Sequence, residues 1–225
     1  MKNSCIIVAG GSGLRMGGEL PKQFICVNGI PLLMYTIRNF YSFDPSLQLI
    51  LVLPEDQVST WNELCVKHDF NIAHQVIAGG DTRFRSVKNG LTLARNCELI
   101  AIHDGVRPLV SHETLARCFN CAAELGTAIP VLPAHESVRE GDLSESVPVD
   151  RSRIFMVQTP QVFKASVIRE SYLQSWRPEF TDDASVVEHL GLTVNLVMGN
   201  RENIKITFPE DLVIANFYLI ATSKF

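Results

Sequence analysis

The stretch CIIVAGGSGLRMGGELPKQF, residues 5–24, places a short apolar run directly before a loop crowded with glycine. Glycine loses more conformational freedom on folding than any other residue, so this density indicates a main chain that must stay bare of side chains. The loop also carries two cations, Arg15 and Lys22, seven positions apart. We interpret the stretch as a buried strand that opens into a ligand-binding loop. A surface turn is the alternative.

Two familiar glycine-loop patterns fail here. The dinucleotide fingerprint G-x-G-x-x-G, counted from Gly11 and Gly13, meets Met16 at its sixth position. The Walker pattern, counted from Gly13 to Gly18, meets Glu19 where its lysine should stand. What remains is a strand followed by bare amides that can surround a phosphate group, with a cation on either side.

Further apolar runs of strand length alternate with helical patterns along the chain. The strand candidates are residues 5–10, 49–54, 74–80, 99–105, 127–133 and 193–200. Most are apolar throughout, as in strands buried on both faces of a parallel sheet. This predicts an α/β fold, a Rossmann-like three-layer sandwich with a mostly parallel central sheet. We expect one domain over 1–225, a hairpin-like arm projecting at 134–158, and a closing helix opened by Pro209.

Composition limits the class of protein. Hydrophobic residues make up 46% of the 225 and charged residues 20%, which suits a sizeable core and excludes disorder. With a net charge of −4, neither nucleic acid nor an anionic membrane is an expected partner, and any anionic ligand must be held by locally gathered cations. No apolar run approaches the ~20 residues of a membrane span, and the first residues do not form a signal peptide, so a cytoplasmic protein is expected. The six cysteines are interpreted as reduced, and the Cys118–Cys121 pair as part of a helical core.

Two motifs begin helices. In AGGDTRFRSV, residues 78–87, Asp81 is the expected N-cap, and the sequence leaves open whether Arg83 or Arg85 faces the site. In TDDAS, Thr181 or Asp182 is the expected cap, with acids at the positive end of the helix dipole. Capping alone explains both motifs, and it is compatible with a binding role.

Charged residues also follow a buried strand in HDGVRP and interrupt an apolar one in NIKIT. Asp104 stands at the edge where open α/β sheets bind ligands. Because a desolvated carboxylate needs a cation or a metal, Asp104 is a candidate for a ribose, a magnesium shell, or a salt bridge to Arg107. His103 is interpreted as mainly structural. Lys205 is placed in a strand, either as an edge charge or as a buried reagent.

These motifs, in their order and spacing, resemble those of the bacterial cytidylyltransferases that act on 2-C-methyl-D-erythritol 4-phosphate in isoprenoid precursor synthesis. GSGLRM followed by PKQ resembles a nucleotidyltransferase signature, and AGGDTRFRSV, HDGVRP, VDR, QTPQ, TDDAS and NIKITFPEDL extend the resemblance over nearly the whole chain. The resemblance implies CTP and a polyol phosphate as substrates and Mg²⁺ as the metal. It also implies a homodimer in which the arm completes the neighbour's site.

The resemblance further implies roles for single residues. Arg15 and Lys22 are the predicted catalytic cations, which neutralise charge on the phosphates. The predicted CTP-binding residues are Ala9, Gly10, Gly11, Gly13, Gly80, Asp81, Ser86, Asp104 and Arg107. The base pocket within that set is Ala9, Gly10, Gly80, Asp81 and Ser86, and Asp104 is also the candidate ligand of Mg²⁺. The predicted polyol-phosphate contacts are Ser137, Arg151, Thr159, Thr181 and Lys205, the first two reached across the dimer. Ser137 stands where the family usually has threonine, and Arg139 where it often has lysine.

The implied reaction is an in-line attack of the substrate phosphate on the α-phosphorus of CTP, with release of pyrophosphate. Three alternatives accompany it. A ribitol-5-phosphate cytidylyltransferase would share the fold and the chemistry. A nicotinamide-dependent oxidoreductase would need the G-x-G-x-x-G that the chain lacks. A nucleotide-sensing module would bind CTP without releasing pyrophosphate.

Overall fold

The strand that precedes the glycine loop, β1 (Lys2–Val8), lies inside the sheet. It pairs in parallel with β4 (Gln48–Leu53) on one side and with β6 (Cys97–Asp104) on the other. The strand β5 (Gln75–Ala78) continues this parallel block at one edge. The computed structural model describes residues 2–10 and 21–222, with the side chains of 3–10 and 21–220. Buried residues dominate β4 and β6, as their apolar runs predict.

The other half of the sheet is mixed. The strand β11 (Gln161–Lys164) runs antiparallel to β6 and to β7 (Thr127–Pro133). Beyond it, β7 pairs with β10 (Phe155–Val157) in antiparallel and with β12 (Leu196–Met198) in parallel orientation. Among the described residues the order is β10-β7-β11-β6-β1-β4-β5, with β12 also on β7.

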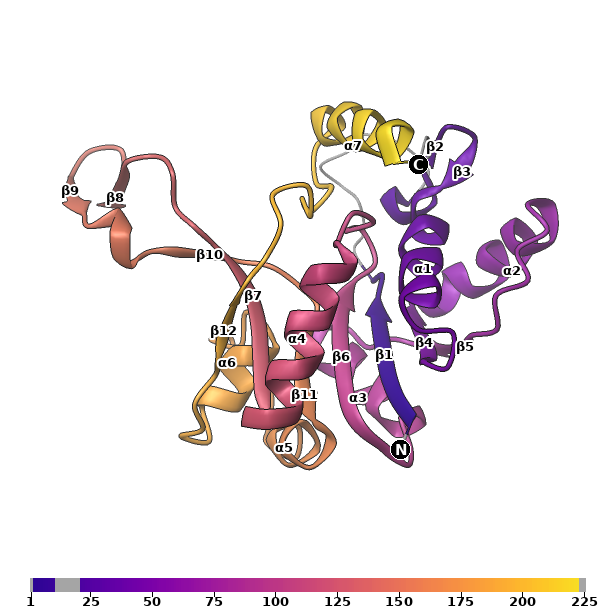
Figure 1. Ribbon diagram of the computed structural model, residues 1–225, viewed down its shortest axis with the longest axis horizontal. Coiled ribbons are helices and arrows are strands. Elements are labelled where there is room, and N and C mark those ends of the chain that lie inside the picture. Colours follow the sequence, from indigo (N-terminus) through magenta and orange to yellow (C-terminus); the bar gives the residue numbers. More distant parts are fainter. Residues whose placement is uncertain (1, 11–20, 223–225) are drawn as a thin grey trace.

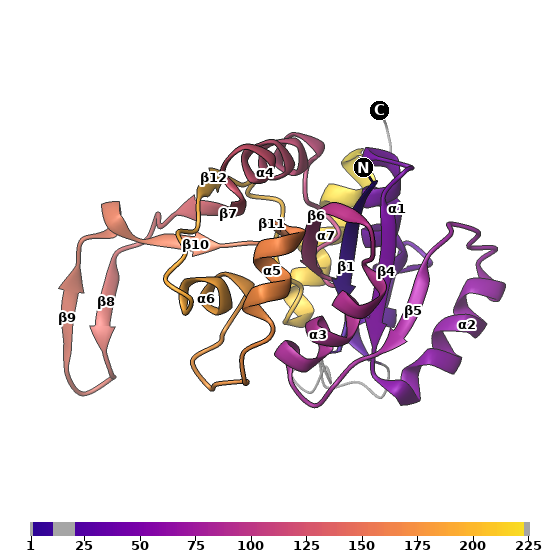
Figure 2. The same ribbon diagram turned by 90° about the horizontal axis from the view of Figure 1, so that it is seen from below.

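Helices cover both faces of the sheet (Figures 1 and 2). One core contains residues of α1 (Leu32–Phe43), α2 (Val58–Lys67) and α4 (His112–Leu125). The other contains residues of α3 (Arg83–Leu93), α5 (Ala165–Ser171) and α6 (Asp183–Glu188). Along β1, Cys5 and Ile7 face the first core and Ile6 faces the second, because side chains alternate across a strand. The predicted three-layer α/β sandwich is confirmed.

A third apolar cluster lies under the last helix. The helix α7 (Pro209–Thr222) begins at Pro209, as predicted, and buries Ala215 and Leu219 against the small hairpin of β2 (Cys26–Val27) and β3 (Ile30–Pro31). Single 3₁₀ turns occur at η2 (Lys22–Phe24), η3 (Glu55–Gln57) and η4 (Arg151–Arg153). None of the helices in the described ranges is both long and apolar enough to cross a membrane.

The predicted arm contains a hairpin, β8 (Val138–Gly141) paired with β9 (Ser146–Val149). In both views it projects away from the body of the molecule (Figures 1 and 2). The last residues of the predicted range, 155–158, instead return into the main sheet through β10. Both cysteines belong to α4. The Cys118 side chain is fully buried in the core and Cys121 is partly buried against it, so the expected core packing of this pair is confirmed.

Candidate active site

Residues at or just beyond the carboxyl ends of β1, β5 and β6 meet at one edge of the sheet. Val8 pairs with both Val52 and Asp104, so the carboxyl ends of these parallel strands are level. A cavity of about 280 Å³ lies at this edge. Of the predicted site residues, its wall includes Ala9, Gly10, Lys22, Gly80, Asp81, Ser86, Asp104 and Lys205. Segments far apart in the sequence thus form one site, while Gly11, Gly13 and Arg15 lie outside the described residues.

One wall of the cavity is made of bare main chain around a serine. The Ser86 hydroxyl donates to the carbonyl of Thr82 at 2.9 Å and accepts from the Gly80 amide at 3.1 Å. A Cβ at Gly79 would lie 2.8 Å from the Ser86 Oγ, and one at Gly80 would lie 2.4 Å from the Cβ of Arg85. Glycine is required at both positions because the chain approaches the first turn of α3 so closely.

The N-cap of α3 corrects the prediction made for Asp81. Thr82 is the cap, and its hydroxyl accepts from the Arg85 amide at 3.1 Å. A capping side chain must reach the amide three positions on, and the helix begins at Arg83, so Asp81 stands one residue too early. Its carboxylate instead pairs with the Arg85 guanidinium at 2.6 Å, with both side chains largely exposed.

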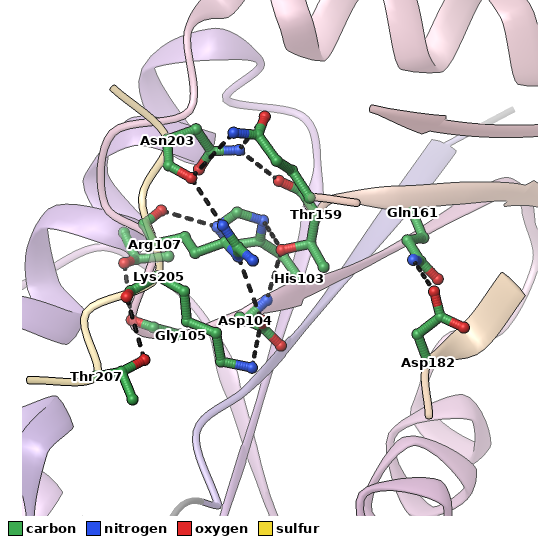
Figure 3. Close-up of polar contacts among 12 residues, drawn as sticks. His103, Asp104, Gly105, Arg107, Thr159, Gln161, Asp182, Asn203, Lys205 and Thr207 are labelled. Carbon is green, nitrogen blue, oxygen red and sulfur yellow. Dashed lines mark hydrogen bonds and ion pairs between the residues drawn. The ribbon is translucent and has the colours of Figure 1, made fainter. Parts of the chain in front are cut away.

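Three cations surround the Asp104 carboxylate at the cavity wall. The Lys205 Nζ lies 3.0 Å and the Arg107 Nε 3.3 Å from its Oδ2 (Figure 3). The Arg83 Nε lies 3.8 Å from its Oδ1. Burial alone would raise the pKa of Asp104, but the three cations outweigh it and hold that pKa well below its usual value. The carboxylate is therefore ionised, and the predicted salt bridge to Arg107 is present.

Arg83, rather than Arg85, faces the site. Its Nη2 donates to the Asp183 Oδ2 at 2.6 Å, and the Tyr172 hydroxyl donates to the other oxygen of the same carboxylate, also at 2.6 Å. Burial opposes the charge on Arg83, yet Asp183 and Asp104 together raise its pKa above the ordinary value. The guanidinium is thus held between two acids, one at the cavity wall and one on α6.

His103 and Thr159 fix the backbone on which Asp104 stands. The His103 Nε2 lies 2.9 Å from the Arg107 carbonyl, which can only accept, so this nitrogen carries the proton. The Nδ1 then accepts from the Thr159 hydroxyl at 3.0 Å, and the hydroxyl oxygen accepts from the Asp104 amide at 3.1 Å. Burial lowers the pKa of His103 to about 4, which agrees with a neutral ring. The structural interpretation of His103 is confirmed.

Lys205 lies at the cavity, but the strand predicted for it is not formed. Residues 203–207 have no strand assignment, and a backbone hydrogen bond of 3.0 Å from the Ile206 amide to the Val106 carbonyl anchors them. A single bond of this kind fixes an extended segment without making it part of the sheet. The Lys205 side chain keeps 46% of its surface exposed.

Lys22 opens the 3₁₀ turn η2 directly after Pro21, as the fixed φ of the proline allows. It lines the cavity together with Gln23. This cation and Lys205 therefore reach one space from opposite ends of the sequence.

The remaining predicted contacts do not line this cavity. Ser137 and Arg151 are exposed on the arm, where the Arg151 Nη1 donates to the His135 carbonyl at 2.5 Å. Thr159 is buried behind Asp104, and Thr181 is exposed one residue before Asp182, the N-cap of α6. Their substrate roles stay predictions.

Three residues that make contacts in or behind the site stand inside the sequence motifs, but the motifs alone assign them no role. The motifs do not distinguish Arg83 from Arg85, they explain Asp183 as an acid at a helix start, and they give Asn203 no role. The available signal was their position inside motifs with other charged residues. Their partners lie 100 positions away for Arg83–Asp183 and 96 for Arg107–Asn203, so local patterns cannot pair them.

Comparison with known proteins decides the family. Residues 4–221 match the family model described as 2-C-methyl-D-erythritol 4-phosphate cytidylyltransferase. The chain belongs to this family. A 2-C-methyl-D-erythritol 4-phosphate cytidylyltransferase from Bacteroides fragilis is 52% identical over 97% of this chain and 100% of its own length. One of the same name from Bacteroides thetaiotaomicron is 50% identical over the same shares. The crystal structure of 4-diphosphocytidyl-2C-methyl-D-erythritol synthase from Anaerococcus prevotii has a TM-score of 0.81 at 28% identity, covering 97% of this chain and 98% of that one. The resemblance read from the motifs is confirmed.

Proposed function

We propose that this protein transfers the cytidylyl group of CTP to 2-C-methyl-D-erythritol 4-phosphate, giving 4-diphosphocytidyl-2-C-methyl-D-erythritol and pyrophosphate. Membership of the cytidylyltransferase family identifies the substrates. The observation that carries the proposal is the cavity itself, where a glycine–serine wall lies beside Lys22 and the cations around Asp104. Such a site offers main-chain groups to a flat base and positive charge to phosphates.

The reaction needs alignment more than acid–base chemistry. An oxygen of the polyol phosphate attacks the α-phosphorus of CTP and forms a new P–O bond. The bond from that phosphorus to the bridging oxygen breaks in line, and pyrophosphate leaves with the electron pair. A phosphate monoester is already ionised and nucleophilic at neutral pH. The protein therefore has to bring two polyanions together and neutralise the charge on the oxygens of the reacting phosphorus.

The cations differ in how firmly they are held. The Arg107 side chain is 12% exposed and its Nη1 also donates to the Asn203 carbonyl at 2.7 Å, so it stays on Asp104. Lys205 is 46% exposed and can exchange Asp104 for a substrate phosphate. Together with Lys22 and Arg15 it supplies the neutralising charge in this proposal.

The base is assigned to the bare wall. Cytosine carries an exocyclic amine, which donates hydrogen bonds, next to ring acceptors. Main-chain groups of Ala9, Gly10 and Gly80, with the Ser86 hydroxyl between them, offer both kinds of partner on the cavity side. A bulky side chain at Gly80 would close this approach.

Mg²⁺ requires oxygen ligands, and Asp104 offers a carboxylate at the cavity wall. Across the described ranges, no three His, Cys, Asp or Glu residues are placed to hold a metal ion. Magnesium commonly takes one or two carboxylates and completes its shell with substrate phosphates and water. Asp104, ionised at the cavity wall, fits the single-carboxylate case. In this proposal Asp104 holds Mg²⁺ jointly with the CTP phosphates, and the ion supplies further charge neutralisation there.

The arm is assigned to a neighbouring site in a homodimer. Ser137 and Arg151 lie on a segment that projects away from the body of the molecule (Figure 2), which supports contact with another molecule. The arm and the adjoining strands also expose the apolar side chains of Val147, Phe155 and Met156. Exposed apolar side chains on a projecting segment support its assignment to an interface between proteins.

The function is tested by measuring pyrophosphate release with each of the four nucleoside triphosphates and with both polyol phosphates. Release with CTP and 2-C-methyl-D-erythritol 4-phosphate supports the proposal. A higher kcat/KM with ribitol 5-phosphate would instead support a ribitol-5-phosphate cytidylyltransferase, the alternative that the family match does not favour. Binding of CTP without release under any pairing would instead indicate a sensing module.

The shared site is tested by mixing two inactive variants, Lys22→Ala and Arg151→Ala. If Arg151 acts in the partner's cavity, a mixed dimer contains one intact site, and random exchange restores about a quarter of wild-type activity. If both residues act within one chain, no mixture regains activity. Each variant alone is the control, and light scattering reports whether dimers form.

A further inference from the structure

Asn203 belongs to a closed ring of hydrogen bonds behind the cavity (Figure 3). Its Nδ2 donates to the Thr159 carbonyl at 2.8 Å, and its own carbonyl accepts from the Arg107 Nη1 at 2.7 Å. Thr159 continues the ring through its hydroxyl, which accepts from the Asp104 amide at 3.1 Å. Arg107 closes it through the contact of 3.3 Å with the Asp104 carboxylate. Four residues from three separate segments are thus tied to one another.

Gln158 adds a second tie to the same segment. Its Nε2 donates to the Asn200 carbonyl at 2.9 Å and to the Asn203 carbonyl at 3.3 Å. Gly199 leaves room for this side chain, because a Cβ there would lie 2.3 Å from the Gln158 Oε1. Both Asn203 and Gln158 are buried. The stretch between β12 and α7 is therefore fixed by side chains where it has no sheet pairing of its own.

Lys205 stands two residues beyond Asn203 on this stretch. The next anchor is the Ile206 amide, which donates to the Val106 carbonyl at 3.0 Å. Between these two anchors the chain has little freedom, so the base of the Lys205 side chain is fixed relative to Asp104 and Arg107. Its ammonium group then reaches the Asp104 Oδ2 at 3.0 Å with the side chain still half exposed.

The Asn203 side chain carries a buried polar atom whose placement does not favour stability. Its Oδ1 is buried, and it finds no hydrogen-bond partner within the part of the chain that the structure describes. Leaving a buried acceptor unsatisfied is unfavourable and uncommon in native proteins. At this cost the side-chain amide ties Thr159 to the Lys205 segment, while the main-chain carbonyl of the same residue accepts from Arg107, and this arrangement points to a role in positioning charge.

We propose that the Asn203 side chain is a positioning group for the transfer reaction, which sets where Lys205 presents its charge to the incoming phosphate. The inference rests on the proposed function. Asn203 touches neither substrate in this scheme; it acts through Lys205. Replacing Asn203 with alanine removes its side-chain bonds to the Thr159 carbonyl and the Gln158 amide oxygen, which loosens the segment that carries the lysine while every charged side chain of the site remains present.

A double-mutant cycle tests the proposal, using Asn203→Ala, Lys205→Met and the combination. Asn203→Ala should lower kcat/KM for the polyol phosphate on the order of tenfold in the wild-type background. In the Lys205→Met background the same change should cost less than about threefold, because the group that Asn203 positions is already gone. Equal losses in both backgrounds would overturn the proposal and leave Asn203 with a role in folding only.

The matched control is Asn195→Ala. The Asn195 Nδ2 donates to the Thr127 Oγ1 at 2.8 Å and to the Thr127 carbonyl at 3.3 Å, a comparable pair of bonds away from the cavity. This variant should change thermal stability without changing kcat/KM. A matching loss of activity in Asn195→Ala would count against a specific role for Asn203. If Asn203→Ala does not fold, Gln158→Leu takes its place in the cycle.

The same cycle is repeated on the binding of inorganic phosphate, measured by calorimetry. Coupling between Asn203 and Lys205 in phosphate affinity supports the positioning role without any turnover, and additive effects oppose it. Failure of the wild-type protein to release pyrophosphate would reject the proposed function. The binding cycle would still decide on Asn203, so the two failures are distinguishable.

Discussion

Acidification should destabilise this protein through a single buried histidine. His103 is fully buried, with Phe40 in edge contact at 4.7 Å between ring centres, and burial lowers its pKa to about 4. In the unfolded chain the pKa of histidine is about 6.5. Between these two values the unfolded state binds a proton that the folded state does not, so the free energy of unfolding decreases as the pH falls. The full effect is ~3.4 kcal/mol, of which ~2 kcal/mol is lost between pH 7 and pH 5.

The measurement is urea unfolding at several pH values for the wild type and for His103→Gln, which cannot titrate. The variant is less stable at pH 7 because it loses ring packing and one hydrogen bond. Its stability should nevertheless fall by ~2 kcal/mol less than that of the wild type on going to pH 5. This window lies above the range in which the unfolded Asp104 takes up a proton, so that carboxylate does not contribute.

His189→Gln is the control. His189 is exposed and makes a similar edge contact with Phe180, at 5.4 Å between ring centres. Its curve should run parallel to that of the wild type. Parallel curves for the wild type and His103→Gln from pH 7 to pH 5 would refute the reasoning, because they would mean that His103 binds its proton equally in both states.

Three further predictions concern the cavity. Gly80→Ala places a Cβ 2.4 Å from the Cβ of Arg85, so the wall must shift, and the KM for CTP should rise on the order of tenfold; an unchanged KM contradicts a base pocket here. Asp183→Asn removes the partner held at 2.6 Å from Arg83, and urea unfolding should show a loss of ~3 kcal/mol; a loss below ~1 kcal/mol argues against a buried pair. Lys22→Ala should lower kcat at least ~100-fold in the pyrophosphate assay, and a kcat near the wild-type value removes Lys22 from the mechanism.

The parallel half of the sheet could be predicted because its strands carry their own signal. Each of β1, β4 and β6 contains a continuous apolar run, which is typical of buried parallel strands. The strands β10 and β11 have three and four residues and exist through their pairing with β7 and β6. Nothing local marks such short segments as strands, since their hydrogen bonds are made to distant parts of the chain.

The site shows the same division between local and distant causes. The bare wall at Gly80 follows from a glycine pair next to a helix start, which a local pattern can indicate. The N-cap predicted for α3, Asp81, lies one residue before the observed cap, Thr82. Both are residue types that cap helices, and only the start of α3 at Arg83 distinguishes them. The choice between Arg83 and Arg85 depends on where Asp183 lies after folding, and that position is tertiary information.

A chain with a net charge of −4 must gather cations locally to hold anionic substrates, and the arrangement around Asp104 shows how. Three cations share one carboxylate, and in the proposed function the incoming phosphate takes one of them from Asp104. The cation that leaves most readily is the one whose charge is already hydrated, because moving it requires little change in solvation. Lys205 is 46% exposed and Arg107 only 12%, and Arg107 is also bonded to the Asn203 carbonyl. In the proposed function the exchange therefore falls to Lys205, while Arg107 keeps Asp104 in place.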